Sequence, residues 1–156
     1  MIKATYKKFT LNFKNPSGTS RGILRTKETW FLILEENGKK GYGETGLFRG
    51  LSIDDVPEYE EKLVWVCKHI HLGVEKLLEQ LSHFPSIQFG IEQACLSLKS
   101  TTPFELFPSP FTESKAPIPI NGLIWMGDKE FMKNQIKEML NQGFSCLKMK
   151  IGSINF

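Results

Sequence analysis

A proline-rich stretch divides the chain into two parts that have different patterns of secondary structure. Five prolines fall within residues 101–119, at Pro103, Pro108, Pro110, Pro117 and Pro119. Proline fixes φ and has no backbone N–H, so this stretch predicts an ordered connector rather than a helix or strand. We therefore predict one domain over residues 1–115 and the start of a second over residues 116–156.

Strands precede helices in the first part. Strand-like patterns cover residues 2–13, 23–36 and 40–44, and the Asn15–Gly18 cluster is predicted to end the first strand. Asn37-Gly38 predicts a tight hairpin turn, because both residues tolerate positive φ. The three strands should form an antiparallel meander, which needs a cover on one of its faces.

Three helices are predicted to supply that cover. Apolar residues recur at helical spacing from Tyr59 to Ile70, after candidate N-caps in residues 52–55, and again over residues 73–81. A third helix is predicted after Pro85, with Ser86 as its cap. Strands followed by helices in separate blocks indicate an α+β domain.

Beyond the connector the pattern changes to strand, helix, strand. The first strand is predicted from Ile118 to Trp125, and the helix between Asp128 as its cap and Gly143 at its end. Its apolar stripe comprises Phe131, Met132, Ile136, Met139 and Leu140. Such a βαβ unit has parallel strands and a right-handed crossover. One unit does not bury its own apolar faces, so the sequence predicts the start of a larger, truncated domain.

The last strand carries two lysines on one face. Strand side chains alternate, so Lys148 and Lys150 should point away from Leu147, Met149 and Ile151. Neighbouring cations disfavour each other's protonation, which would suit one lysine to act as a general base. Solvated lysines on an exposed strand explain the same short motif, so both interpretations stay open.

Composition excludes several classes of protein. The net charge of +3 comes from 20 basic and 17 acidic residues spread along the chain, which gives no basic patch for nucleic acid. No apolar run is long enough for a membrane span, and the first residues do not resemble a signal peptide. The three cysteines are odd in number and widely spaced, as is typical of a reduced interior. We therefore expect a soluble cytoplasmic protein.

Three motifs, in this order, resemble the enolase superfamily and its muconate-lactonizing subgroup. They are Gly41-Tyr42-Gly43-Glu44, the Ile-Glu-x-Ala motif within residues 85–94, and Lys148-Met149-Lys150. In that superfamily an α+β capping domain precedes a modified (β/α) barrel. The resemblance thus implies a capping domain, with a three-stranded antiparallel meander and helices, followed by the first βαβ of a truncated (β/α) barrel.

Within this subgroup, residues 18–22, 46–52 and 119–127 most resemble the o-succinylbenzoate synthases. This resemblance implies a carbon–oxygen lyase of menaquinone biosynthesis, which removes an α-proton and then water from a small carboxylate substrate. Lys150 would be the base and Lys148 its neighbour. The resemblance also implies Mg²⁺, whose acidic ligands belong to the third, fourth and fifth barrel strands, so we expect no metal ligand in this sequence.

The same resemblance assigns the choice of substrate to two loops of the capping domain. It points to Ser20 and Arg21 in one loop and to Phe48 and Arg49 in the other. Either arginine would suit a substrate carboxylate, where charge-assisted hydrogen bonds are favourable. A surface ion pair for each arginine, and simple packing for Phe48, are the alternatives.

Two other functions fit the same residues. A dipeptide epimerase or another racemase of the subgroup would use Lys148 and Lys150 with a second catalytic lysine opposite, on the sixth barrel strand. A non-catalytic capping or interaction fragment would instead expose the apolar face of the last strand. We expect catalysis from the complete barrel and none from these 156 residues alone. Homo-oligomerisation is left open, and neither nucleic acid nor membrane is an expected partner.

Overall fold

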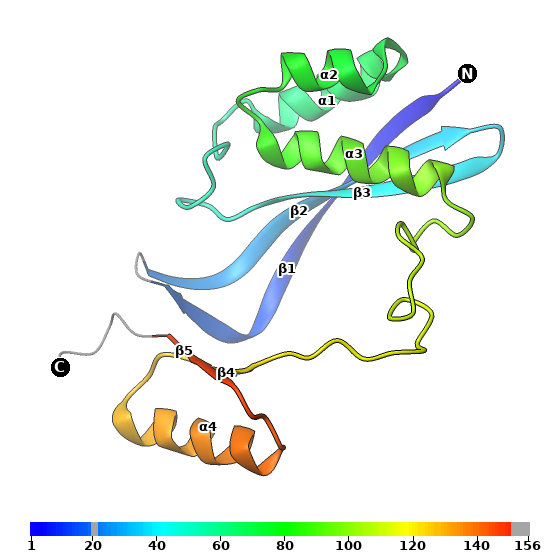
Figure 1. The fold of residues 1–156 in the computed structure, drawn as a ribbon. Coiled ribbons are helices and arrows are strands. Elements are labelled where there is room, and N and C mark those ends of the chain that lie inside the picture. The colour runs from blue at the N-terminus through cyan, green and yellow to red at the C-terminus, as the bar shows by residue number, and fades with distance from the viewer. Residues whose placement is uncertain (20–21, 151–156) are drawn as a thin grey trace.

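The computed structural model describes residues 1–19 and 22–150. An antiparallel sheet contains β1 (Lys3–Thr19), β2 (Gly22–Glu36) and β3 (Lys39–Leu47) in that order. Figure 1 shows the helices gathered over one part of this sheet. They are α1 (Tyr59–His69), the 3-10 helix η1 (Ile70–Leu72), α2 (Val74–Gln80) and α3 (Pro85–Lys99). The predicted meander covered by helices is confirmed.

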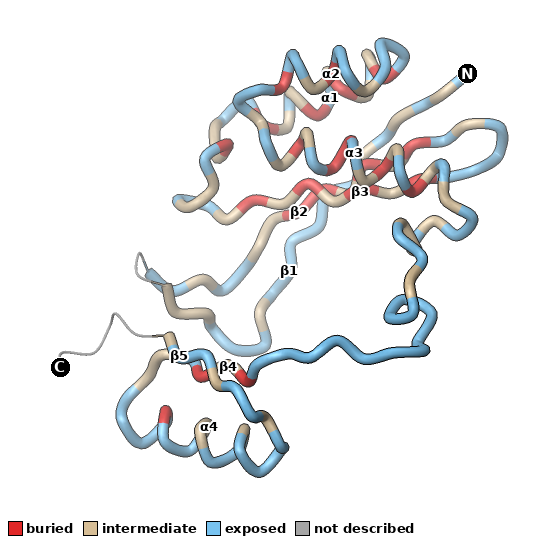
Figure 2. Tube along the Cα trace, in the orientation of Figure 1, coloured by how far each residue is buried: buried red, intermediate tan, exposed pale blue. Residues whose placement is uncertain are grey.

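The hydrophobic core lies between the sheet and the helices (Figure 2). Trp30, Leu32 and Leu34 of β2 are completely buried, and so are Leu63 of α1 and Ile91 of α3. Their alternation along β2 directs one face of the strand toward the helices, as period-two patterning requires. Burial of these side chains is the main force that holds helices and sheet together.

The turn between β2 and β3 is the one predicted. Glu36 pairs with Lys39, and Asn37 and Gly38 between them have φ values of 51° and 78°. Both values are typical of the tight hairpin turns that favour asparagine and glycine.

The predicted end of the first strand at Asn15–Gly18 is wrong, because β1 continues to Thr19. Its register with β2 shifts between Asn12, which pairs with Thr26, and Ser17, which pairs with Leu24. Pro16 lies within this irregularity, where a strand tolerates a residue that has no N–H to donate. Beyond the pairing of Glu28 with Leu47 of β3, β1 and β2 therefore continue past the helices as a two-stranded arm toward β4 and β5 (Figure 1). This arm comprises residues 11–19 and 22–27.

The predicted cap of α1 is also wrong. The α1 N-cap position is Glu58, which makes no side-chain capping bond. Buried Asp54 instead accepts hydrogen bonds from the backbone N–H (2.9 Å) and the hydroxyl (2.5 Å) of Ser86. Ser86 lies inside the first turn of α3, whose N-cap position is Phe84. Asp54 thus joins the loop before α1 to the start of α3, a long-range contact that local sequence does not reveal.

The second part of the chain is a small parallel unit of β4 (Gly122–Ile124), α4 (Lys129–Asn141) and β5 (Leu147–Met149). This βαβ unit is confirmed, although its first strand begins at Gly122 rather than Ile118. Asp128 caps α4 by accepting a hydrogen bond from the N–H of Phe131 (2.8 Å), and Gly143 ends the helix with φ of 88°.

The apolar stripe of α4 is only partly buried. Met132 is 5% exposed, whereas Phe131 is 50% and Leu140 56% exposed. Residues 101–119 contain no helix or strand, as the prolines predict. No helix within the described residues is both long and apolar enough to cross a membrane.

Candidate functional site

Both predicted catalytic lysines lie at the carboxyl end of β5. Lys148 pairs with Leu123 of β4, and the N–H of Lys150 extends this ladder by donating to the carbonyl of Ile124 (3.0 Å). Lys148 is exposed and Lys150 is half-buried. The carboxyl end of parallel strands is the edge at which α/β proteins place their reacting groups.

Trp125, the first residue after β4, contacts the side chain of Lys150. The Nζ atom of Lys150 lies 3.9 Å from the centroid of the Trp125 ring, well within the range of a cation–π interaction. Trp125 is 39% exposed. The side chain of Lys148 has no such partner within residues 22–150.

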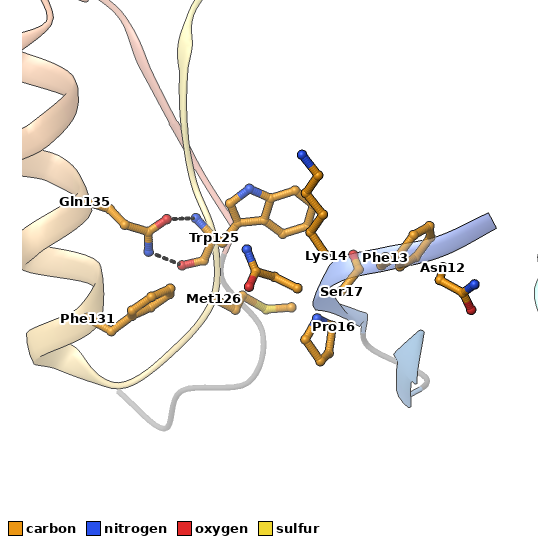
Figure 3. A pocket seen from close by; sticks show the side chains of 11 residues that line it. Asn12, Phe13, Lys14, Pro16, Ser17, Trp125, Met126, Phe131 and Gln135 are labelled. Carbon is orange, nitrogen blue, oxygen red and sulfur yellow. Dashed lines mark hydrogen bonds between the residues drawn. The ribbon is translucent and has the colours of Figure 1, made fainter. Parts of the chain in front are cut away.

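The backbone of Trp125 is paired with the side chain of Gln135 on α4. The N–H of Trp125 donates to Oε1 of Gln135 (3.0 Å), and Nε2 of Gln135 donates to the carbonyl of Trp125 (3.1 Å), as Figure 3 shows. One amide side chain thus satisfies both backbone groups of the residue at which β4 ends. Sequence analysis missed Gln135, although it follows Phe131 by four residues and so lies on the same face of the helix.

A cavity of about 830 Å³ separates the arm from the end of β4 (Figure 3). Its lining combines amide, lysine, aromatic and sulfur-containing side chains. The arm contributes Asn12, Phe13, Lys14, Asn15, Pro16, Ser17 and Gly18, and the βαβ unit contributes Trp125, Met126, Phe131 and Gln135. The structure therefore brings residues 12–18 of β1 close to the end of β4, where Trp125 contacts Lys150. A large apolar pocket with a few polar groups is the usual form of a small-molecule site.

Two of the predicted specificity residues, Ser20 and Arg21, lie outside the described residues. Gly18, just before them in the chain, lines the cavity. Their assignment to substrate choice stays a prediction.

The other two predicted residues, Phe48 and Arg49, lie in the loop after β3. The Nη1 atom of Arg49 is 2.6 Å from Oδ1 of Asp55, and its Nε donates to Oε2 of Glu28 (2.5 Å). Phe48 is half-buried, with Nζ of Lys27 lying 5.7 Å from its ring centroid. Arg49 thus has two carboxylate partners from its own domain. Its role toward a substrate carboxylate stays a prediction.

Arg49 does not line the same cavity as Trp125. It lines a separate hollow of about 410 Å³, together with Glu28 and with Arg25 and other residues of the arm. The structure consequently places the predicted residues apart. Lys150 contacts Trp125, which lines the first cavity, whereas Arg49 lines the second.

Glu44, the last residue of the glycine-rich strand motif, is engaged within the sheet. Its Oε1 atom accepts from Nζ of Lys27 (2.8 Å) and from the hydroxyl of Thr29 (2.8 Å). The hydrogen bond from Lys27 is the largest influence that lowers the pKa of Glu44 below its ordinary value. Glu44 therefore stabilises the arm as an ionised carboxylate.

Glu28 provides a test of the charge network at the base of the arm. Its carboxylate pairs with Lys8 (2.7 Å) and with Arg49, and the bond from Lys8 is the largest influence that lowers its pKa below 4.5. A carboxylate whose pKa is depressed by folding stabilises the protein above its unfolded pKa. That stabilisation is lost as the pH falls through the folded pKa.

We therefore expect the Glu28→Gln variant to lose stability at neutral pH and to show a shallower decline below about pH 4.5. Urea midpoints measured from neutral pH to about pH 3 would check this. Glu36→Gln is the matched control, because the Glu36 side chain has no hydrogen bond or ion pair within the described residues. If the urea midpoints of the parent and of Glu28→Gln fell equally steeply below about pH 4.5, the expectation would be contradicted.

A metal site is not formed by the described part of the chain. No group of three or more histidine, cysteine, aspartate or glutamate side chains there is arranged to hold an ion. The described residues therefore do not by themselves fit the magnesium that the family resemblance implies.

Comparisons with known proteins agree with the observed architecture. No family model matches the chain. It is 34% identical over 186 aligned positions to an o-succinylbenzoate synthase of Desulfotalea psychrophila, covering 99% of the chain and 50% of that relative. The crystal structure of MenC from the same organism superposes with a TM-score of 0.79 at 29% identity, covering 96% of this chain and 49% of that one.

A dipeptide epimerase from Enterococcus faecalis, solved with Mg and the dipeptide L-Leu-L-Tyr, shares the fold. Its TM-score is 0.69 at 18% identity, with 97% of this chain and 46% of that chain covered. At this identity the likeness concerns the fold alone.

A three-stranded sheet with helices, followed by a parallel βαβ unit, accounts for about half of an enolase-fold chain. The chain belongs to the enolase superfamily. Within that superfamily it matches the N-terminal portion of o-succinylbenzoate synthase. The chain spans about half the length of the relatives just described.

Proposed function

We propose that this chain is the N-terminal part of an o-succinylbenzoate synthase, a carbon–oxygen lyase that acts on a small carboxylate. The observation that carries the proposal is the 34% identity to such a synthase over 99% of the chain. The position of Lys150 supports it, because this amine lies at the carboxyl end of β5, against a tryptophan that lines the cavity beneath the arm.

The chemistry assigns different roles to the two lysines. Removal of a proton next to a carboxylate places a second negative charge on that group, so the transition state needs nearby positive charge. Lys150, as a neutral amine, takes the α-proton on Nζ, and Lys148 supplies a cation on the same strand. The C–O bond then breaks, and the hydroxyl group leaves as water with the proton that Lys150 has taken. Magnesium would add positive charge in the complete enzyme, and its ligands are proposed to lie in the half of the relatives that this chain does not span.

A fusion protein tests the proposal directly. Residues 1–156 would be joined to the C-terminal half of the Desulfotalea psychrophila synthase, and formation of o-succinylbenzoate from its cyclohexadiene precursor would be measured. Turnover by the fusion supports the proposal. A fusion that folds by circular dichroism and binds the product, yet forms no o-succinylbenzoate, contradicts it.

The same fusion separates the synthase from the epimerase alternative. The likeness to a dipeptide epimerase concerns the fold alone, so it does not favour that activity. Epimerisation of L-Ala-L-Glu by the fusion, without dehydration, would replace the proposed function by the alternative.

A further inference from the structure

Trp125 joins α4 to the predicted catalytic strand. Its N–H and carbonyl lie 3.0 and 3.1 Å from the two ends of the Gln135 amide. β4 ends at Ile124, whose carbonyl accepts from the N–H of Lys150 (3.0 Å), and Gln135 supplies the partners of the next two backbone groups along the chain. Two reciprocal hydrogen bonds to one planar amide determine both the position and the rotation of the Trp125 backbone.

The indole ring of Trp125, positioned in this way, contacts the amine of Lys150. The ring centroid is 3.9 Å from Nζ, and tryptophan is the aromatic side chain that attracts a cation most strongly. A lysine side chain has four rotatable bonds, and a partner for its ammonium group restricts the positions that it visits. The contact therefore holds the amine of Lys150 beside the wall of the cavity.

The neighbouring lysine is not restricted in this way. Lys148 is exposed and has no side-chain partner within residues 22–150, although it lies on the same short strand. Among the described residues, therefore, the amine of Lys150 has a partner and that of Lys148 has none. Such a difference is what a reaction needs when one amine must reach a particular proton.

We propose that Gln135 and Trp125 are positioning residues for the amine of Lys150. Gln135 fixes the backbone of Trp125, and the indole face of Trp125 fixes the amine. The structural part of this inference stands on the contacts alone, whereas its effect on turnover rests on the proposed function.

Nuclear magnetic resonance of the 156-residue chain tests the positioning without any assay of activity. With ¹³C-labelled lysine, the ε-methylene signal of Lys150 is expected upfield of the other lysines, because it lies over the indole face. The Lys150→Arg variant identifies that signal. Trp125→Leu should return it to the position of an exposed lysine, and Trp125→Phe should restore part of the displacement.

Gln135 is tested by the same signal. Gln135→Leu removes both hydrogen bonds to Trp125, so the displacement should decrease. Gln142→Leu is the matched control, because within the described residues the Gln142 side chain bonds only to Glu138, at the exposed end of the same helix. An undisplaced Lys150 signal in the parent, or equal signals in the two glutamine variants, would overturn the inference.

The fusion protein tests the consequence for turnover. Trp125→Leu is expected to lower kcat by about tenfold with little change in KM, because the substrate still binds while the amine is misplaced. Trp125→Phe should recover most of this loss. An unchanged kcat in Trp125→Leu overturns the catalytic part of the inference. An inactive parent fusion with a displaced Lys150 signal rejects the proposed function and leaves the positioning intact.

Discussion

Replacement of Gly43 by alanine is expected to lower the free energy of unfolding by about 3–5 kcal/mol. A Cβ atom at Gly43 would lie 1.8 Å from the carbonyl oxygen of Gly90 on α3, far inside van der Waals contact. The backbone fixes the position of a Cβ atom, and the Gly90 oxygen is itself a backbone atom, so no side-chain rotation relieves the overlap. Helix α3 would have to move away from β3.

That movement would break the contacts by which α3 covers the edge of the sheet. The N–H of Glu44 donates to Oε1 of Gln93 (3.0 Å), and the N–H of Tyr42 donates to the hydroxyl of Ser97 (2.9 Å). β3 is an edge strand, whose outward N–H groups need such partners. The loss therefore combines overpacking with two hydrogen bonds, which explains its expected size.

Gly18→Ala is the matched control for Gly43→Ala. Both changes add one methyl group and reduce the freedom of the unfolded chain equally, but nothing lies within 4 Å of a Cβ at Gly18. Its free energy of unfolding, derived from the urea midpoint, should stay within about 1 kcal/mol of that of the parent. If Gly43→Ala unfolded at the same urea concentration as Gly18→Ala, the close contact of α3 with β3 would be wrong.

This contact also explains two of the three motifs on which the family resemblance depends. Gly41 and Gly43 on β3 face α3, where a Cβ at Gly41 would lie 2.3 Å from the carbonyl of Ala94. Gln93 and Ala94 belong to the Ile-Glu-x-Ala motif. The glycines of one motif thus allow the helix of the other to approach, and the two motifs form one packing arrangement.

Local sequence predicted those features of the fold that local chemistry determines. The Asn37-Gly38 turn and the Asp128 cap were predicted correctly, because positive φ and an N-terminal carboxylate act within a few residues. Asp54 was misassigned, since it bonds Ser86, which is distant in the sequence. The length of β1 was underestimated for a similar reason, because pairing with β2 carries the strand through Pro16.

In the candidate site, too, the sequence predicted the local features and missed the tertiary contacts. Strand alternation placed Lys148 and Lys150 together at a strand end, and the parallel pairing of β4 with β5 agrees with that placement. The contacts of Trp125 with Gln135 and Lys150 depend on how α4 docks, so no local pattern reveals them. Arg49 lies in the predicted loop, but its ion pairs with Glu28 and Asp55 depend on tertiary structure.

Lys150→Ala has the largest effect on activity that we expect. In the fusion protein it should lower kcat by about 10²–10⁴-fold, the usual contribution of a general base, while the protein still folds. The side chain contacts the ring of Trp125 and is only half-buried, so its removal leaves no buried cavity. Circular dichroism and the urea midpoint should therefore match those of the parent, which separates lost chemistry from lost structure.

Lys148→Ala and Lys7→Ala serve as graded controls for Lys150→Ala. In the proposed mechanism Lys148 supplies charge rather than accepting the proton, so its removal should reduce kcat by about tenfold to a hundredfold, less than the removal of Lys150. Lys7 lies on β1, away from the cavity, and its removal should leave turnover unchanged. Equal losses of kcat in Lys148→Ala and Lys150→Ala would mean that both lysines act only through their positive charge. Full turnover in Lys150→Ala would remove this residue from the mechanism, because no other positioned base on β5 could replace it.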